Sequence, residues 1–403
     1  MKARSHAHRA RWLNRTVVGV GLTSLLSDLS HETATTLLPT FLGTLGAAAA
    51  WLGLIEGVSD GLSSVAKMAS GYYTDRLRRR KPIAVAGYIV TALGTAAMGF
   101  ASSPWHVLVA RAAAWLGRGV RTPVRKALLA GSVTQEAYGR AFGFERMMDT
   151  AGAIVGPLCA FFLLQLLNHR YALLFALTLI PGLLAAGTMA FVVKEEARVA
   201  VAHVSFGASL RALPARFRQF LLAVLVFGAG DFAHSLLILL AMQKLAPSLG
   251  IAKAASLAAA LYVLHNAVYA GTSMLAGSLA DRMEKKYLLA AGYATGALMA
   301  LAVVLLPLNL ATLAGVFAVG GVYLGMEETL EDSFCAELVA RAQHGVAFGT
   351  LATVNGVGDF VSSIVLGLLW TSLGTATAFG YSALLFVAGA LMVLLIATPR
   401  KAD

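Results

Sequence analysis

Charged residues are scarce in this chain of 403 residues, where Asp, Glu, Lys and Arg together make up 13%. Soluble proteins contain about 25% charged and 45–50% apolar residues, whereas 58% of this chain is hydrophobic. A water-soluble shape cannot hide that much apolar surface, so the bilayer must be the solvent. The same composition excludes a disordered chain, a collagen helix and a soluble coiled coil.

Cysteines and enzyme motifs are also scarce. The only two cysteines, Cys159 and Cys335, exclude a disulfide scaffold. The chain has no phosphate-binding Gly-x-x-x-x-Gly-Lys-Ser loop, no His-Glu-x-x-His and no Cys-x-x-Cys. We therefore expect no ATP-driven pumping, no enzymatic activity and no cofactor.

Long apolar runs dominate what is present. A stretch of about 20 apolar residues crosses a bilayer core of about 30 Å. The sequence predicts twelve such spans, at residues 15–42, 49–71, 83–102, 105–129, 140–166, 170–193, 219–244, 251–278, 287–308, 310–331, 345–371 and 376–397.

The basic residues set the expected orientation. Of the 32 Lys and Arg residues, 27 fall in the two tails and in alternate loops or the adjoining span ends. The positive-inside rule then places both termini in the cytoplasm. The same distribution explains the net charge of +12 without a nucleic-acid partner. The expected partners are the lipid bilayer, protons and a small molecule or ion as substrate, with the protein acting as a monomer.

The chain repeats itself at half its length. Gly71-Tyr-Tyr-Thr-Asp75-Arg76 recurs 206 positions later as Gly277-Ser-Leu-Ala-Asp281-Arg282. Gly139-Arg-Ala-Phe-Gly143 recurs at the same offset as Gly345-Val-Ala-Phe-Gly349. These matches predict two homologous six-helix bundles, as in parallel-repeat transporters. We place the bundles at residues 1–193 and 219–403, with a cytoplasmic linker at 194–218.

These motifs resemble those of a known family. The segment from Gly71 to Arg76 resembles the signature loop of the major facilitator superfamily, and the resemblance extends to a poorly characterised bacterial branch. Gly152, Gly156 and Pro157 resemble the glycine–proline motif of its proton-coupled exporters, although Leu158 follows where a glycine is usual. The resemblance implies an all-α fold of twelve transmembrane helices in two pseudo-twofold-related bundles. It also implies a secondary active transporter of the inner membrane that works by alternating access.

Ionisable residues inside the predicted spans are the candidate substrate or proton sites, because each costs about 2.5–3.5 kcal/mol on insertion scales. In span 1 the spacing of the charged residues places them on one helix face, and span 7 carries a similar Asp-x-x-His pair. Carboxylates and imidazole suit proton exchange, a divalent-metal site, or a structural network between helices. The candidates are Asp28, His31, Glu32, Glu56, Asp60, Arg111, Asp231, His234, Asn355 and Asp359, with Asp28, His31, Asp231 and His234 as candidate metal ligands.

The inner ends of spans 4 and 10 carry opposite charge. The 206-residue repeat aligns Arg125 with Glu331 and Lys126 with Asp332. This complementarity predicts ion pairs between the bundles that close the cytoplasmic side, with Arg125 and Glu331 as one pair. The expected cytoplasmic gate consists of Arg118, Arg121, Arg125, Lys126, Glu327, Glu328, Glu331 and Asp332.

A second group of residues is expected to act mechanically. Asp75 can accept hydrogen bonds at the start of a neighbouring helix, and Gly71 would let spans 2 and 11 approach. The resemblance implies that Asp149 contacts the Asp75–Arg76 loop. Gly152 and Gly156 would pack span 5 on span 8, and Pro157 would bend it. The expected conformational latch is Gly71, Asp75, Arg76, Asp149, Gly277, Asp281 and Arg282.

The sequence therefore favours a secondary active transporter, with proton-coupled export of a small solute as the preferred interpretation. A divalent-metal exporter of the iron or nickel type, using the paired Asp-x-x-His residues, is the alternative within transport. A non-transporting membrane receptor or scaffold is the alternative from another class.

Overall fold

The computed structural model describes residues 12–47, 49–195, 205–232 and 234–397, and these form helices joined by turns and short connections, without a strand. The first group of long helices is α1 (Arg15–Thr44), α2 (Ala49–Thr74), α3 (Lys81–Ala97), α4 (Pro104–Gly131), α5 (Tyr138–Leu166) and α6 (Tyr171–Phe191). The second group is α8 (Ala215–Gly228), α9 (His234–Leu249), α10 (Ile251–Ala280), α11 (Lys285–Leu305), α12 (Leu310–Leu338), α13 (His344–Leu373) and α14 (Thr375–Leu394). The predicted all-helical fold is confirmed.

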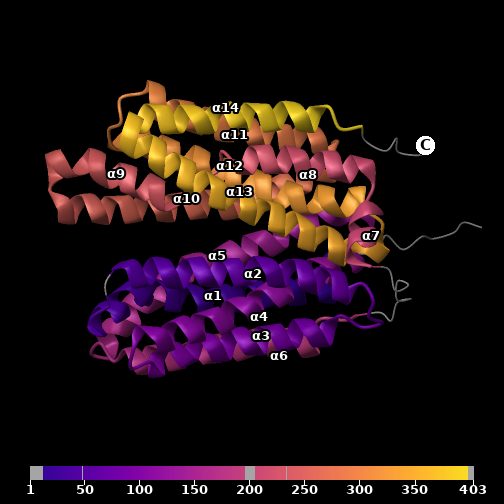
Figure 1. Ribbon diagram of the computed structural model, residues 1–403, viewed down its shortest axis with the longest axis horizontal. Helices are drawn as coiled ribbons and strands as arrows, with labels where there is room; N and C mark the ends of the chain where they lie inside the picture. The colour runs from indigo at the N-terminus through magenta and orange to yellow at the C-terminus, as the bar shows by residue number, and fades with distance from the viewer. Residues whose placement is uncertain (1–11, 48, 196–204, 233, 398–403) are drawn as a thin grey trace, which may run out of the picture.

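The two groups pack as two bundles, one above the other in Figure 1. Within the first bundle, α1 packs on α5 and α6, and α4 packs on α2 and α3. Within the second, α10 packs on α12, and α11 packs on α12 and α14. The bundles meet through α5 against α10 and α2 against α13, and the short helix α7 (Phe206–Arg211) lies in the connection between them. We call residues 15–191 the N-bundle and residues 215–394 the C-bundle.

The helices begin and end where the sequence has the residues for it. The side chain of Asn14 accepts hydrogen bonds from two backbone N–H groups in the first turn of α1, and Asn309 forms a capping box at α12. Gly250 and Gly374 have φ of +79° and +91° at the tight turns before α10 and α14. Residues other than glycine rarely adopt a positive φ. Glycine can therefore connect two consecutive helices through a single residue.

One predicted span is not a continuous helix. We expected a single span at 219–244, but α8 ends at Gly228 and α9 begins at His234. Asp231 lies in the break, where its carboxylate accepts the backbone N–H of Phe232 at 2.8 Å. The hydroxyl of Tyr381 donates to the freed carbonyl of Ala229 at 3.0 Å. Backbone that leaves the helix within a membrane must find such partners, and a broken span often borders a binding site.

Eight helical stretches of the described chain are long and apolar enough to cross a membrane by length and composition alone. The predicted spans outside this set are α1, α2, α4 and the broken α8–α9. The first three carry charged side chains within the span, and the fourth is interrupted. All four of these spans bear candidate functional residues, although others, such as Asp359 of α13, lie on helices within the set.

The glycines of α5 pack against a different helix than expected. A Cβ atom added at Gly152 would meet the backbone of α1 at Leu25, and one at Gly156 would lie 2.7 Å from the Cβ of Glu32. The expected packing of these glycines on span 8 is therefore wrong. Helix α5 touches span 8, which is α10, through Gly139 and Gly143 nearer its start. Its later part, at Gly152 and Gly156, packs on α1 of its own bundle.

Candidate functional site

Two related contacts tie the bundles together at one end of the molecule, which we call the latch side. Asp75 directly follows α2, and its carboxylate accepts the backbone N–H groups of Gly345 at 2.9 Å and Val346 at 2.8 Å, at the start of α13. Asp281 directly follows α10 and accepts the N–H groups of Gly139 at 2.8 Å and Arg140 at 3.2 Å, at the start of α5. A helix N-terminus favours negative charge, so each carboxylate holds the opposite bundle.

Glycines make this approach possible. A Cβ atom at Gly71 would collide with the carbonyl oxygen of Gly345, and one at Gly277 would collide with that of Gly139. At both crossings the obstructing atoms belong to backbone, which cannot rotate away. Small residues at helix crossings allow this close packing in membranes. The glycines and the two aspartates therefore act together at each crossing.

The cations of the latches differ from the expected ones. Asp75 pairs with Arg80, and Asp281 pairs with Arg140, whose Nε lies 2.5 Å from the carboxylate. Arg76 instead stacks over the ring of Tyr72 and donates to the Tyr72 carbonyl at 2.7 Å. No ion pair involving Arg282 occurs among the described residues. The sequence offered several neighbouring arginines, and only the folded loops decide which one reaches the carboxylate.

Burial acts on both latch carboxyls. It raises the pKa of Asp75, and Arg80 together with the two N–H donors acts in the opposite direction. Burial likewise raises the pKa of Asp281, against the hydrogen bonds from Arg140 and Gly139. Both contacts require the acceptor oxygens that ionised carboxylates provide.

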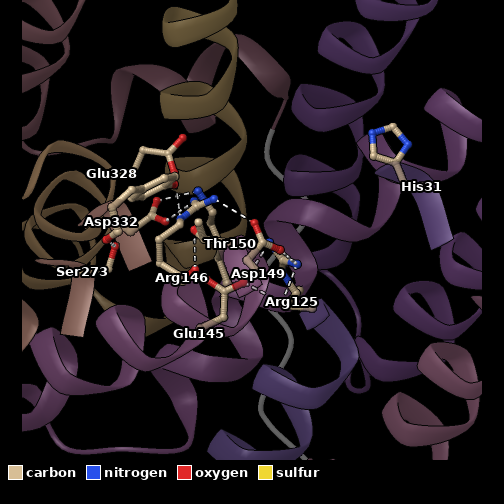
Figure 2. Close-up of polar contacts among 12 residues, drawn as sticks. His31, Arg125, Glu145, Arg146, Asp149, Thr150, Ser273, Glu328 and Asp332 are labelled. Atoms are coloured by element: carbon tan, nitrogen blue, oxygen red, sulfur yellow. Dashed lines mark hydrogen bonds and ion pairs between the residues drawn. The ribbon is translucent and has the colours of Figure 1, made fainter. Parts of the chain in front are cut away.

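Ion pairs between the bundles lie close to the latches. Lys126 of α4 reaches Asp332 of α12, with Nζ and Oδ1 2.6 Å apart. Arg146 of α5 lies 2.8 Å from Glu328 and 3.6 Å from Asp332, both on α12. Figure 2 shows Arg146 between these acids and Asp149 of its own helix. Of the expected gate, Lys126, Glu328 and Asp332 join the bundles.

Of the other expected gate residues, Arg118, Arg121, Arg125 and Glu331 contact residues of their own bundles. Arg125 lies 2.9 Å from Glu145 and 3.4 Å from Asp149, so the predicted Arg125–Glu331 pair is wrong. Glu331 instead accepts hydrogen bonds from Tyr293 at 2.5 Å and Asn355 at 2.8 Å. Arg125 and Glu331 each have partners on neighbouring helices of their own bundle. The 206-residue offset of the repeat cannot reveal such partners.

The contacts of Arg121 and Asp149 also differ from the expected ones. Arg121 lies over the ring of Tyr88, with 4.1 Å from the guanidinium carbon to the ring centroid, and takes no part in joining the bundles. Asp149 binds Arg125 and Arg146 and not the Asp75–Arg76 loop, so the contact implied by the resemblance is wrong. Asp149 shares Arg146 with the acids of α12, and in this way it supports the same closed side.

The charged face of α1 lies buried inside the N-bundle. Asp28 and His31 are 6% and 3% exposed, and Glu32 is partly exposed. His31 Nε2 lies 2.5 Å from Arg118 and 3.4 Å from Glu32, and its ring packs at a tilt against Trp115, with the ring centroids 4.4 Å apart. Among the described residues, no hydrogen bond or ion pair reaches the carboxyl of Asp28. Asp28 is therefore a buried acid without a fixed partner.

The two carboxylates one turn apart on α2 each have a partner on α4. Glu56 binds Arg111 at 2.9 Å. Asp60 accepts the indole N–H of Trp115 at 2.8 Å, and Arg111 stacks over the same indole at 3.5 Å. These partners offset the repulsion expected between two acids at this spacing. The role of Trp115 was not foreseen, because its position in the sequence resembles an ordinary packing site.

The C-bundle contains an acidic cavity of about 230 Å³ beside the break between α8 and α9. The hydroxyl of Tyr323 donates to Asp231 at its edge. The side chain of His234 lies outside the described set, and among the described side chains no group of three His, Cys, Asp or Glu could hold a metal ion. The lining residues are Phe227, Gly228, Asp231, Phe232, Leu324, Glu327, Glu328, Asn355, Asp359 and Ser363.

The chain is similar to known transporters over its whole length. Residues 20–326 and 220–403 match the family described as Major Facilitator Superfamily. An uncharacterised MFS-type transporter of Methanocaldococcus jannaschii is 26% identical over 386 residues, 96% of each chain. The multidrug resistance protein MdtH of Citrobacter koseri is 33% identical over 118 residues, 28% of this chain and 29% of that protein.

Solved structures share the fold. The E. coli fucose:proton symporter FucP has a TM-score of 0.78 at 15% identity, covering 95% of this chain and 98% of that one. FucP in its outward conformation gives a TM-score of 0.79 at 15% identity, covering 95% and 99%. At this identity the similarity concerns the fold alone.

Proposed function

The chain belongs to the Major Facilitator Superfamily and is a multi-pass membrane transporter, and from this premise we propose that it exports a small solute in exchange for protons. We place it in a bacterial inner membrane as a monomer, with both termini in the cytoplasm. The latch side is then cytoplasmic, and the described conformation is the outward-facing one.

The observation that carries the proposal is the paired closure of one side. Two latches and the Lys126–Asp332 ion pair hold the bundles together there. Each of these contacts joins the N-bundle to the C-bundle, so rocking one bundle against the other would break them together. A set of contacts that exists in one state only is what alternating access requires.

Asp28 supports coupling to protons. It is buried and unpartnered within the described chain, one turn from His31 and Glu32. An isolated ionised carboxylate is expensive to bury, so Asp28 would change its protonation when the surrounding helices move. Proton binding at Asp28 would then bias the equilibrium between the two states. Export, as opposed to import, is supported by the partial similarity to MdtH and by the glycine–proline motif at Gly156 and Pro157.

The test uses the full chain in liposomes that contain a pH-sensitive dye. A proton gradient is imposed, and organic cations, organic anions and divalent metals are added in turn. We expect solute-dependent proton movement that is lost in Asp28→Asn and kept in Glu284→Gln, a carboxyl exposed on the latch side. Solute flux without proton movement would refute the coupling. No flux of any solute would favour the receptor or scaffold instead.

A further inference from the structure

The acidic cavity of the C-bundle contains a carboxyl that has no counter-ion. Glu327 of α12 lines the cavity and is 5% exposed. Within the described part of the chain, no hydrogen bond or ion pair reaches its carboxyl. Its negative charge is therefore buried beside an empty space, which is unfavourable unless a proton or a cation joins it.

The other acids around the cavity differ from Glu327. Glu328 accepts from Tyr269 and pairs with Arg146, and Asp231 accepts from Tyr323. Asp359 of α13 also has no side-chain partner among the described residues and lines the same cavity, but it is exposed where Glu327 is buried. The cavity thus holds two unpaired acids, Glu327 and Asp359, on two different helices.

A cation of the N-bundle does not fill this role. Lys67 of α2 lies close enough for its charge to act on Asp359. No ion pair within 4.0 Å joins the two in the described structure. Since no Lys or Arg among the described residues pairs with Glu327 or Asp359, we infer that a bound ligand supplies the positive charge.

The lining favours an organic cation over a bare metal ion. The described carboxyls do not converge as a group of three that could ligate a metal. Phe232 adds an aromatic ring to the wall, and aromatic faces attract ammonium groups. The ring of Phe227 is stacked between Tyr293 and Phe386, so Phe227 contributes only apolar contact. The volume of about 230 Å³ lies below the 300–1,000 Å³ typical of drug-sized ligands, so the cavity fits a small amine or the head of a larger one.

We propose that this cavity binds the ammonium group of the transported solute, with Glu327 and Asp359 as its counter-ions and Phe232 as the aromatic part of its wall. The substrate class is then small organic cations. The assignment rests on the proposed transport function for its biological meaning, but binding itself does not require transport.

The test measures binding to the full purified chain in detergent by calorimetry. The charged probes are choline and butylammonium, and their uncharged counterparts of similar shape are 3,3-dimethylbutan-1-ol and 1-butanol. We expect a charged probe to bind at least tenfold more tightly than its counterpart. Equal binding of charged and uncharged probes, or no binding of either charged probe, would overturn the proposal.

Variants then locate the site. Glu327→Gln and Asp359→Asn should each weaken binding of the charged probe at least tenfold, whereas Glu284→Gln should leave it unchanged. Thermal unfolding without probe shows whether each variant is folded, and Asp359→Asn provides a second reading if Glu327→Gln is not. Unchanged binding in both cavity variants would refute the assignment.

The same variants separate this inference from the proposed function. If the probes bind as expected but no solute-dependent proton movement occurs in liposomes, the cavity stands and proton exchange fails. If proton exchange occurs while binding is insensitive to Glu327 and Asp359, the transport function stands and the cation site fails.

Discussion

The crossing of Gly277 with α5 offers a direct test of the closed side. In Gly277→Ala the new Cβ would lie 2.8 Å from the carbonyl carbon of Gly139 and 3.1 Å from the Cα of Gly143, and closer still to the Gly139 oxygen. Ordinary van der Waals contact lies at 3.4–4 Å. Because the obstructing atoms are backbone and the Gly139 oxygen is the nearest of them, α10 and α5 must move apart by about an ångström at this point.

The expected size of the effect follows from packing energies. An extra methyl group in a well-packed contact costs about 1–3 kcal/mol. The crossing exists only while the latch side is closed, so this energy is lost from one state alone. A difference of this size changes an equilibrium about 5- to 150-fold. The gain of about 0.5–1 kcal/mol from replacing a helical glycine applies to both states and cancels.

The assay is a distance measurement by electron spin resonance between labels at Arg78 and Arg282, which are exposed on the latch side of the two bundles. The native cysteines are replaced beforehand. We expect Gly277→Ala to increase the fraction of molecules with a long distance. Gly271→Ala, on the same helix with nothing within 4 Å of the added Cβ, is the matched control. Equal distance distributions in the two variants would refute the reasoning.

Three further results are expected. Lys126→Met and Asp332→Asn should each open the latch side in the same assay, and their double-mutant cycle should give a coupling energy of about 0.5–3 kcal/mol; additive effects would show that the 2.6 Å ion pair does not act as a pair. Asp75→Asn should open it by about tenfold, because the amide keeps one acceptor oxygen and loses the charge that holds Arg80 and two N–H groups; an unchanged distance distribution would exclude a latch role for the carboxylate. Gly250→Ala should lower stability by about 1–3 kcal/mol in thermal unfolding while leaving transport intact, because its φ of +79° and ψ of 157° suit glycine alone and the space around it is open; an unchanged melting temperature would contradict the strain.

Much of the architecture could be predicted because it depends on one-dimensional signals. The length and spacing of apolar runs predicted the long helices, and the Gly71–Arg76 repeat indicated the relation between the bundles. The break at Asp231 escaped this reasoning, since apolar composition continues through residues 219–244 and carries no sign of where the backbone leaves the helix.

The site was predicted at the level of residue types but not of partners. Lys126 and Asp332 meet as their repeat positions indicate. Arg125 does not meet Glu331, its repeat partner, because it pairs with Glu145 of its own bundle at 2.9 Å. The latch cation is Arg80 and not Arg76, although both follow Asp75 within five residues.

Sequence by itself determined that the chain lies in a membrane, that it is helical and that it is built from two related halves. These properties follow from hydropathy and periodicity, which are sums over many residues and tolerate local variation. Only the tertiary structure decided which charges pair, and it alone showed that Glu327 lines a cavity and has no counter-ion among the described residues. Ion pairs depend on contacts of 3–4 Å between side chains from different helices, and no pattern along one chain contains those distances.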